Sequence, residues 1–323
     1  MARRHKHVRR IRAPLGWALW LLIAVLLMAC GAEQTSAPAT SGAVQQPAAK
    51  TINVVTTMSI LTDMVKNVGG DRVAAENIIP AGAGPEDYQP TPQDAQKIAV
   101  ADIVFYNGHG LEEWLGDLFK SAAKPGQPQI ALSDGLQALG VGSDAFKQGN
   151  PHFWMSAAYG AQYVEKIRDG LTMVDPDGKA IYDRNAAAYI KELLDLNVEL
   201  KRQAEQLPQA ERKIVTNHDA FPYFAQEYGF TVVGDILGNP ESEPSAGDLA
   251  QLVQRIKEQQ VKAVFSESQF SPKLTRTIAD EAGVKIVSTL YTDTLGDVAS
   301  GVTTYTAMLR YDMREIVEAL NQP

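Results

Sequence analysis

The chain has 323 residues, 45 % of them hydrophobic, and a formal net charge of −8. This length and apolar content suit two ordinary globular domains and exclude a fibrous or disordered class. The acidic balance argues against nucleic acid as a partner, because DNA and RNA are bound through clustered basic side chains.

The first 29 residues indicate an export signal. Residues 1–12 carry six lysine and arginine residues and no acid, and residues 17–28 form an apolar run too short to span a bilayer comfortably. The run ends in Leu27-Met28-Ala29-Cys30, which resembles the bacterial lipoprotein box, where the cysteine becomes the lipid-modified first residue. We predict a signal peptide over 1–29 and lipidation of Cys30, the only cysteine in the chain. Ordinary secretion or an uncleaved anchor are the alternatives.

Residues 30–50 are predicted to be a flexible tether. They are mostly Ala, Ser, Thr, Gln and Pro, which cannot bury enough apolar surface to fold. Removal of the signal takes away six basic residues and no acid, which lowers the net charge from −8 to −14. The expected product is an acidic domain anchored through lipid at the outer face of the cytoplasmic membrane, with a cation as a more fitting partner than nucleic acid.

From Thr51 onward, strand-like and helix-like stretches alternate, as in parallel sheets flanked by helices. In the first half we predict strands at 52–56, 73–79, 103–106 and 129–132 and helices at 60–68, 91–100 and 111–122. The second half repeats the alternation, with strands at 213–216, 231–233, 263–266 and 285–289 and helices at 221–228, 246–259, 272–282 and 305–320. The expected fold class is α/β, with two similar parallel-sheet lobes.

A long amphipathic helix is predicted between these halves. Residues 179–207 contain no glycine or proline, and their apolar side chains recur at spacings of four and three. They are Tyr182, Ala186, Tyr189, Leu193, Leu196, Leu200 and Leu207, with Ile190 and Leu194 widening the stripe. At ~1.5 Å per residue the helix spans roughly 40 Å, more than one small lobe. We therefore expect an N-terminal lobe at 51–174, a linking helix at 175–208 and a C-terminal lobe at 209–323; a coiled-coil arm is the alternative.

Metal-competent side chains follow several predicted strands. In such sheets ligands sit at the carboxyl ends of strands, which for two facing lobes means the cleft between them. Four of these loops contain Pro85-Glu86-Asp87-Tyr88, Asn150-Pro151-His152, Asn217-His218-Asp219 and Tyr291-Thr292-Asp293. Only three histidines follow the signal, and two of them fall in these loops, one in each half. A loop histidine by itself is more often solvated than a ligand.

These loops, in this order around a long helix, resemble the metal-binding solute-binding lipoproteins of bacterial ABC importers, the zinc, manganese and iron group that includes the streptococcal adhesin-like lipoproteins. The resemblance runs from about Ile52 to the C-terminus. Its matching segments are PEDYQPTPQD, YNGHGLEEWL, PHFWMS, DPDGKAIYDRNAAAYIKELLDLNVEL, VTNHDAFPYFAQEYG, VFSESQFSPK and LYTDTLG. It implies two α/β lobes, a metal in the cleft between them and delivery of that metal to a membrane permease.

Four metal ligands are implied by this resemblance: Glu86, His152, His218 and Asp293. The first departs from the family, which usually has histidine at that position, so neighbouring Asp87 is an alternative ligand. The side chains expected to surround and support the ligands are Asp87, Tyr88, Trp154 and Glu267, the last as an acceptor for a ligand histidine. His109 is interpreted as a supporting or surface residue, and Glu112 and Glu113 as the solvated face of a helix.

The predicted ligand set favours manganese. Two imidazoles with two carboxylates form a harder site than three imidazoles with one carboxylate, and oxygen ligands suit Mn²⁺ or Fe²⁺. Residues 142–149 also lack the histidine-rich loop of many zinc-importing relatives. Because Zn²⁺ generally outcompetes Mn²⁺ at a given nitrogen and oxygen site, zinc and iron are the alternatives.

We expect a binding protein rather than an enzyme. The chain lacks His-Glu-x-x-His, Gly-x-Ser-x-Gly and phosphate-loop motifs, and no cysteine follows Cys30. The expected function is capture of one divalent ion, without chemistry, and its delivery to an ABC permease. A surface adhesin or scaffold with a structural metal is one alternative, and a metal-dependent hydrolase with water in place of Glu86 is a more remote one.

Overall fold

The computed structural model describes residues 50–141, 146–237 and 244–322. The predictions for the signal peptide, for Cys30 and for the tether up to residue 49 lie outside these residues. In the described part of the chain, none of the helices combines the length and the apolar character needed to cross a bilayer.

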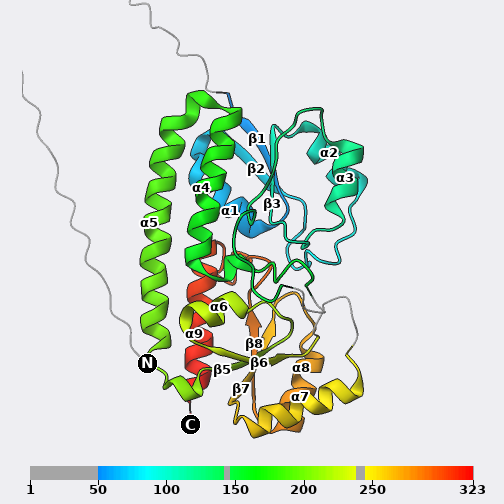
Figure 1. The fold of residues 1–323 in the computed structure, drawn as a ribbon, viewed down its shortest axis with the longest axis vertical. Coiled ribbons are helices and arrows are strands. Elements are labelled where there is room, and N and C mark those ends of the chain that lie inside the picture. Colours follow the sequence, from blue (N-terminus) through cyan, green and yellow to red (C-terminus); the bar gives the residue numbers. More distant parts are fainter. Residues whose placement is uncertain (1–49, 142–145, 238–243, 323) are drawn as a thin grey trace, which may run out of the picture. The chain divides into compact units, whose positions relative to one another are not determined.

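The first half is built on a four-stranded parallel sheet. Its strands lie in the order β2-β1-β3-β4 and are β1 (Ile52–Thr56), β2 (Val73–Asn77), β3 (Ile103–Tyr106) and β4 (Gln129–Ala131). Helix α1 (Ser59–Gly69) covers one face, and α2 (Pro92–Val100) and α3 (Leu115–Ala122) cover the other (Figure 1). The central strands are short apolar runs because both faces of a helix-covered parallel sheet are buried.

The second half repeats this arrangement. Parallel ladders join β5 (Lys213–Thr216) to β6 (Thr231–Asp235) and β7 (Ala263–Glu267) to β8 (Lys285–Leu290), and β5 packs beside β7. The helices are α6 (Pro222–Tyr228), α7 (Ala246–Glu258), α8 (Pro272–Ala282) and α9 (Tyr305–Asn321). The predicted α/β class with two similar parallel-sheet lobes is confirmed.

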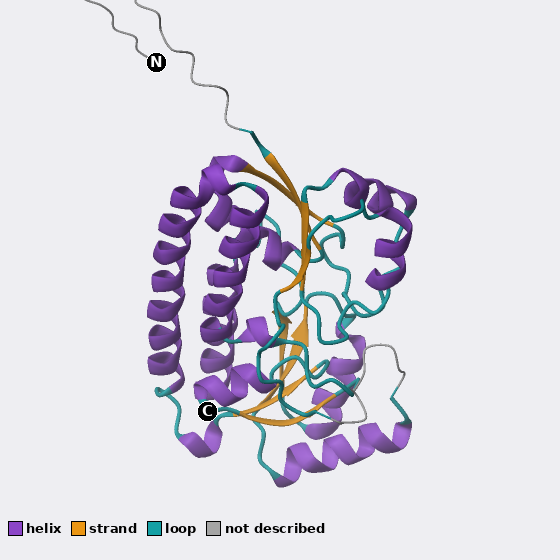
Figure 2. Ribbon diagram, turned by 45° about the horizontal axis from the view of Figure 1, so that its top comes forward, coloured by secondary structure: helices purple, strands orange, loops and turns teal. Residues whose placement is uncertain are grey.

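One long helix, α5 (Lys179–Ala204), connects the halves, and a second long helix, α4 (Ala157–Val174), lies against it (Figures 1 and 2). The 26 residues of α5 give a length of about 39 Å, and the helix packs against α1 and α4 in one lobe and α6 and α9 in the other. A single core of buried apolar side chains runs from the first sheet through α4, α5 and α9 to the second. A smaller core lies between the second sheet and helices α7 and α8.

Helix α4 was not among the predicted elements. Its glycines weaken the helical signal, since glycine is a poor helix former. Two of them allow close packing: a Cβ on Gly160 would meet the Tyr305 ring, and one on Gly170 would meet Phe105. The pattern of buried residues in α4 nevertheless follows the helical period.

Other predictions need correction. Helix α5 ends at Ala204, so Leu207 lies beyond it, and Leu194 is 47 % exposed rather than part of the buried stripe. Glu113 is exposed, but Glu112 is buried at the start of the segment before α3. Its carboxylate accepts hydrogen bonds from Thr57 Oγ1 at 2.7 Å and from the backbone N–H groups of residues 107 and 108. Glu112 therefore ties together the strand ends of the first sheet instead of facing solvent.

Candidate metal centre

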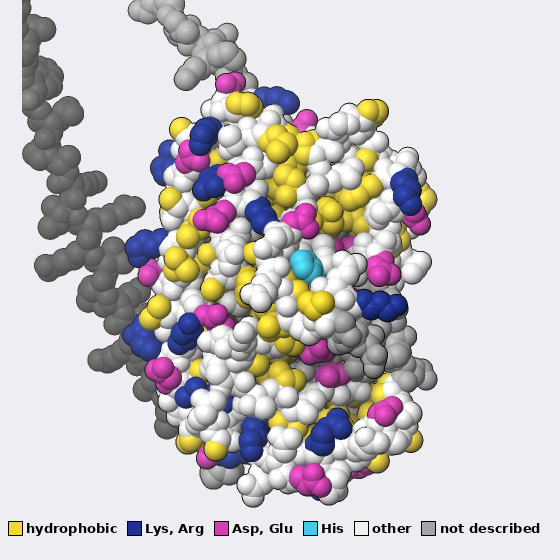
Figure 3. All heavy atoms as spheres, viewed as in Figure 1, with side chains coloured by type: hydrophobic (Ala, Val, Ile, Leu, Met, Phe, Trp, Pro, Cys, Tyr) yellow, Lys and Arg dark blue, Asp and Glu magenta, His cyan; other side chains and the backbone are white. Residues whose placement is uncertain are grey.

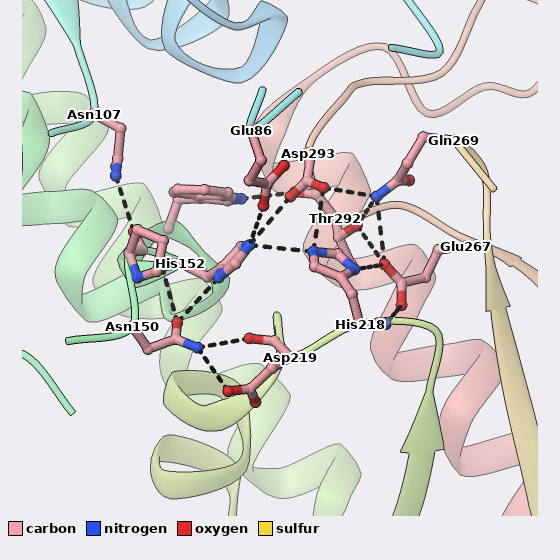
Figure 4. A network of polar contacts seen from close by, with 12 residues as sticks. Glu86, Asn107, Asn150, His152, His218, Asp219, Glu267, Gln269, Thr292 and Asp293 are labelled. Atoms are coloured by element: carbon pink, nitrogen blue, oxygen red, sulfur yellow. Dashed lines mark hydrogen bonds and ion pairs between the residues drawn. The ribbon is translucent and has the colours of Figure 1, made fainter. Parts of the chain in front are cut away.

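Four side chains from four loops converge between the two sheets. Glu86 follows β2, His152 precedes α4, His218 follows β5 and Asp293 follows β8. One nitrogen or oxygen atom of each lies within 4.8 Å of those of the others. Figure 4 shows these side chains pointing toward one another. The side chains of both histidines and Asp293 are fully buried, and that of Glu86 is 11 % exposed.

The spacing of these atoms suits one bound cation. His152 Nε2 lies 3.2 Å from His218 Nε2, 3.4 Å from Glu86 Oε1 and 3.7 Å from Asp293 Oδ1. A four-coordinate ion with bonds of ~2.1 Å holds its ligands about 3.4 Å apart. Within the described residues, Glu86 Oε1 and Asp293 Oδ1 are buried and lack a hydrogen-bond partner. A cation would satisfy both oxygens.

Asn150 orients His152 from the N-terminal lobe. Its Oδ1 lies 3.0 Å from both the backbone N and the ring Nδ1 of His152. Nδ1–H therefore donates to Asn150, which leaves the Nε2 lone pair directed at the cluster. The Asn150 amide also donates to Asp219 O at 2.6 Å and to Asp219 Oδ2 at 3.2 Å. One side chain thus connects the two histidine loops.

Glu267 holds His218 from the C-terminal lobe. Its Oε2 lies 2.6 Å from His218 Nδ1, and its Oε1 accepts the backbone N–H groups of Asn217 at 2.8 Å and His218 at 3.1 Å. Thr292 Oγ1 donates to Oε2 at 2.8 Å. The carboxylate expected to accept from a ligand histidine therefore lies against His218, whose Nε2 faces the cluster.

Burial and neighbouring charges set the protonation of these groups. Burial lowers the pKa of His152 to about 3. Burial also disfavours a charged His218, but Glu267 and Asp293 raise its pKa well above the ordinary value. Burial raises the pKa of Glu86 and of Asp293. Burial opposes the ionisation of Glu267 as well, yet His218 and the hydrogen bonds lower its pKa. The carboxylates around His218 therefore favour positive charge at this point, and a proton there would compete with a metal ion.

The other predicted residues differ in what they contact, and of these Trp154 lies against a ligand candidate. Asp87 is exposed, so Glu86 is the acid of this loop that joins the other three. Tyr88 donates from its hydroxyl to Asp94 at 2.8 Å. The Trp154 ring lies 5.1 Å from the His152 ring, and its Nε1 donates to Thr292 O at 2.6 Å. His109 is partly buried, with Nδ1 2.8 Å from Ser133 Oγ.

Sequence reasoning did not single out Asn150, Thr292 or Gln269. Their positions within two residues of His152, Asp293 and Glu267 are the signal that could have found them, because polar neighbours of ligands often orient those ligands.

On the molecular face in Figure 3, acidic and basic side chains are interspersed, so the acidic net charge is not gathered there into one patch.

Comparisons with known proteins bear on what this centre binds. The chain matches the family model "Zinc-uptake complex component A periplasmic" over residues 54–319. It is 34 % identical over 303 residues to the manganese-binding lipoprotein MntA of Halalkalibacterium halodurans, covering 94 % of this chain and 97 % of that protein. It is 33 % identical over 275 residues to the iron-binding protein YfeA of Yersinia pestis, covering 85 % and 88 %.

Two solved structures share the fold. The periplasmic zinc-binding protein TroA from Treponema pallidum is 28 % identical, with a TM-score of 0.77 over 84 % of this chain and 99 % of that one. A Mn-bound periplasmic metal-binding protein from Candidatus Liberibacter asiaticus is 30 % identical, with a TM-score of 0.75 over 83 % and 99 %. Relatives with this architecture are thus named for manganese, iron and zinc.

Proposed function

The chain belongs to the family of periplasmic zinc-uptake complex components, and we propose that it captures one divalent transition-metal ion outside the cytoplasm and delivers it to an ABC permease. The observation that carries this proposal is the convergence of Glu86, His152, His218 and Asp293 on one buried point. Manganese is proposed as the principal cargo, followed by zinc or iron, because two of the four ligands are carboxylates. The names of the manganese-, iron- and zinc-binding relatives support this range.

We propose that the protein binds and releases the ion without catalysis. A catalytic metal keeps an open position for water or substrate. Here His152 Nε2 lies 3.2–3.7 Å from atoms of the other three residues, so four protein atoms are enough to fill the positions of a four-coordinate ion. This geometry favours cargo over a hydrolytic metal.

Release is proposed to require only small movements of the lobes. Helix α5 packs on both lobes, and the main core is continuous across them. A continuous, well-packed helix resists large hinge bending. Metal-free and metal-loaded protein should therefore give nearly the same small-angle scattering profile, whereas a change typical of wide domain closure would refute this part of the proposal.

Membrane anchoring through Cys30 completes the proposed mechanism. A lipid on this residue and the tether that follows would keep the binding domain near its permease. Replacement by Cys30→Ala should abolish incorporation of labelled fatty acid into the full-length protein without changing its affinity for metal. A wild-type protein that incorporates no fatty acid, or a Cys30→Ala protein that incorporates as much, would contradict lipid anchoring at this residue.

The first experiment is native mass spectrometry with elemental analysis of a chain that starts at residue 50. We expect one ion per chain after incubation with Mn²⁺, and none in His218→Ala. Competition between Mn²⁺ and Zn²⁺ then ranks the two metals. A metal-replete wild-type chain that carries no ion would overturn the proposed function.

A further inference from the structure

One side chain outside the proposed ligand set holds a carboxylate oxygen of Asp293. Gln269 lies in the turn after β7, and its Nε2 is 2.7 Å from Asp293 Oδ2, 2.7 Å from Thr292 Oγ1 and 3.4 Å from Glu267 Oε2. Two of these three neighbours are carboxylate oxygens, which accept hydrogen bonds and cannot donate them when ionised. The amide nitrogen of Gln269, rather than its oxygen, therefore faces them, as Figure 4 shows.

The two oxygens of Asp293 consequently have different surroundings. Oδ2 accepts the hydrogen bond from Gln269 and lies 3.3 Å from His218 Nε2. Oδ1 is buried, lacks a hydrogen-bond partner among the described residues and lies 3.7 Å from His152 Nε2. Both oxygens thus border the cluster, and an ion there could be bound by one or by both.

A short hydrogen bond competes with a metal for the electrons of the same oxygen. Gln269 draws Oδ2 toward the turn after β7, while no such contact restrains Oδ1 within the described residues. Asp293 should then offer a single strong bond through Oδ1. With one atom from each of the other three residues, the site would hold an ion by four atoms instead of by five.

The number of bonds matters for the choice of metal. Zn²⁺ is most often held by four ligands in a tetrahedron, whereas Mn²⁺ favours oxygen-rich sites of higher coordination number. We propose that Gln269 restricts Asp293 to one metal bond and so narrows the margin by which the centre favours manganese over zinc. This inference rests on the proposed function and adds to it a residue that sets metal choice.

Gln269 acts through Asp293 and is therefore a positioning residue. Its amide nitrogen has no lone pair to offer a cation, so it does not bind the ion itself. The test replaces Gln269 by methionine, which has similar length but no N–H donor. The side chain is only partly buried, so the fold should tolerate Gln269→Met. Gln254→Met is the matched control, because Gln254 is exposed on α7 and bonds Glu258.

The first measurement uses Co²⁺ alone as a spectroscopic probe, since its visible absorption is strong in four-coordinate sites and weaker at higher coordination number. We expect strong bands for wild type and Gln254→Met and clearly weaker bands for Gln269→Met. The second measurement is competition between Mn²⁺ and Zn²⁺. The ratio of Mn²⁺ to Zn²⁺ affinity should rise about tenfold in Gln269→Met, as expected when a neighbour of a ligand is changed.

The possible outcomes separate the two proposals. If wild type binds one Co²⁺ but Gln269→Met has the same spectrum and affinity ratio, the role of Gln269 is wrong. An equal loss of affinity for both metals, with an unchanged spectrum, would assign Gln269 a merely structural role and also overturn the inference. A wild-type protein that binds no Co²⁺, Mn²⁺ or Zn²⁺ would overturn the proposed function itself, and this inference with it.

Discussion

The two lobes contribute two side chains each to the proposed metal centre but support them differently. In the C-terminal lobe, His218 rests against the buried carboxylate of Glu267, and Asp293 is fully buried. In the N-terminal lobe, His152 rests against the neutral amide of Asn150, and Glu86 retains 11 % exposure. Negative charge is thus concentrated on the C-terminal side, while the N-terminal side reaches solvent. We infer that the C-terminal pair provides the stronger hold on a cation and that the ion exchanges past Glu86.

The most severe test of this comparison is removal of each histidine in turn. His218→Ala should abolish metal binding and also leave Glu267 buried without its partner. Breaking a buried charge pair costs about 3–5 kcal/mol, which corresponds to a drop in melting temperature of about 5–9 °C for a chain of this size. His152→Ala should weaken binding while lowering the melting temperature in chelator by less. Equal melting temperatures for the two variants would contradict the asymmetry.

A smaller effect is expected from the residues behind the histidines. Glu267→Gln should lower metal affinity by about 10–100-fold, the usual cost of changing a residue that orients a metal ligand. Asn150→Ala removes a neutral hydrogen-bond acceptor and should lower metal affinity by a smaller factor. Isothermal titration with Mn²⁺ measures the affinity of both variants. A larger loss of affinity in Asn150→Ala than in Glu267→Gln would mean that the N-terminal lobe, rather than the C-terminal lobe, holds the ion more strongly.

Exchange past Glu86 predicts a milder change. Glu86→Gln keeps an oxygen at the same place but removes its charge, so affinity should fall roughly tenfold, equivalent to about 1.4 kcal/mol, chiefly through faster release. Stopped-flow dissociation with a chelator measures this rate. Asp87→Asn is the control, because Asp87 is exposed beside the cluster, and it should leave the rate unchanged.

The smallest effect concerns pH. Because Glu267 and Asp293 raise the pKa of His218 despite its burial, the metal-free protein holds a proton that an arriving ion must displace. Affinity should therefore fall as pH falls, by about threefold between pH 7.5 and 7.0 for one displaced proton. Calorimetry in buffers of different ionisation enthalpy should show release of one proton, and Glu267→Gln should reduce it. Binding enthalpies that are independent of the buffer would refute the idea.

The sequence predicted the strands and the loops of the site better than the side chains that support them. Apolar runs such as Ile103–Tyr106 mark buried strands locally, and the four loops were found from their position after strands together with a family resemblance. The bond from Asn150 to Asp219 joins residues 69 positions apart, so no local pattern reveals it. Glu112 was misread for the same reason, since its partner Thr57 lies on another strand end. Helix α4 was missed because its glycines weaken the local helical signal, while their role in close packing against Tyr305 and Phe105 depends on the tertiary structure.

The continuous core through α4, α5 and α9 also bears on how the chain folds. A lobe expressed alone would leave the facing side of α5, with Leu193, Leu196 and Leu200, partly uncovered. Two halves that look like separate domains should therefore unfold in one cooperative transition. Calorimetric and van't Hoff enthalpies should then agree for residues 50–323. Limited proteolysis should therefore not yield two stable halves. Although the architecture is duplicated, neither half should stay folded without the other.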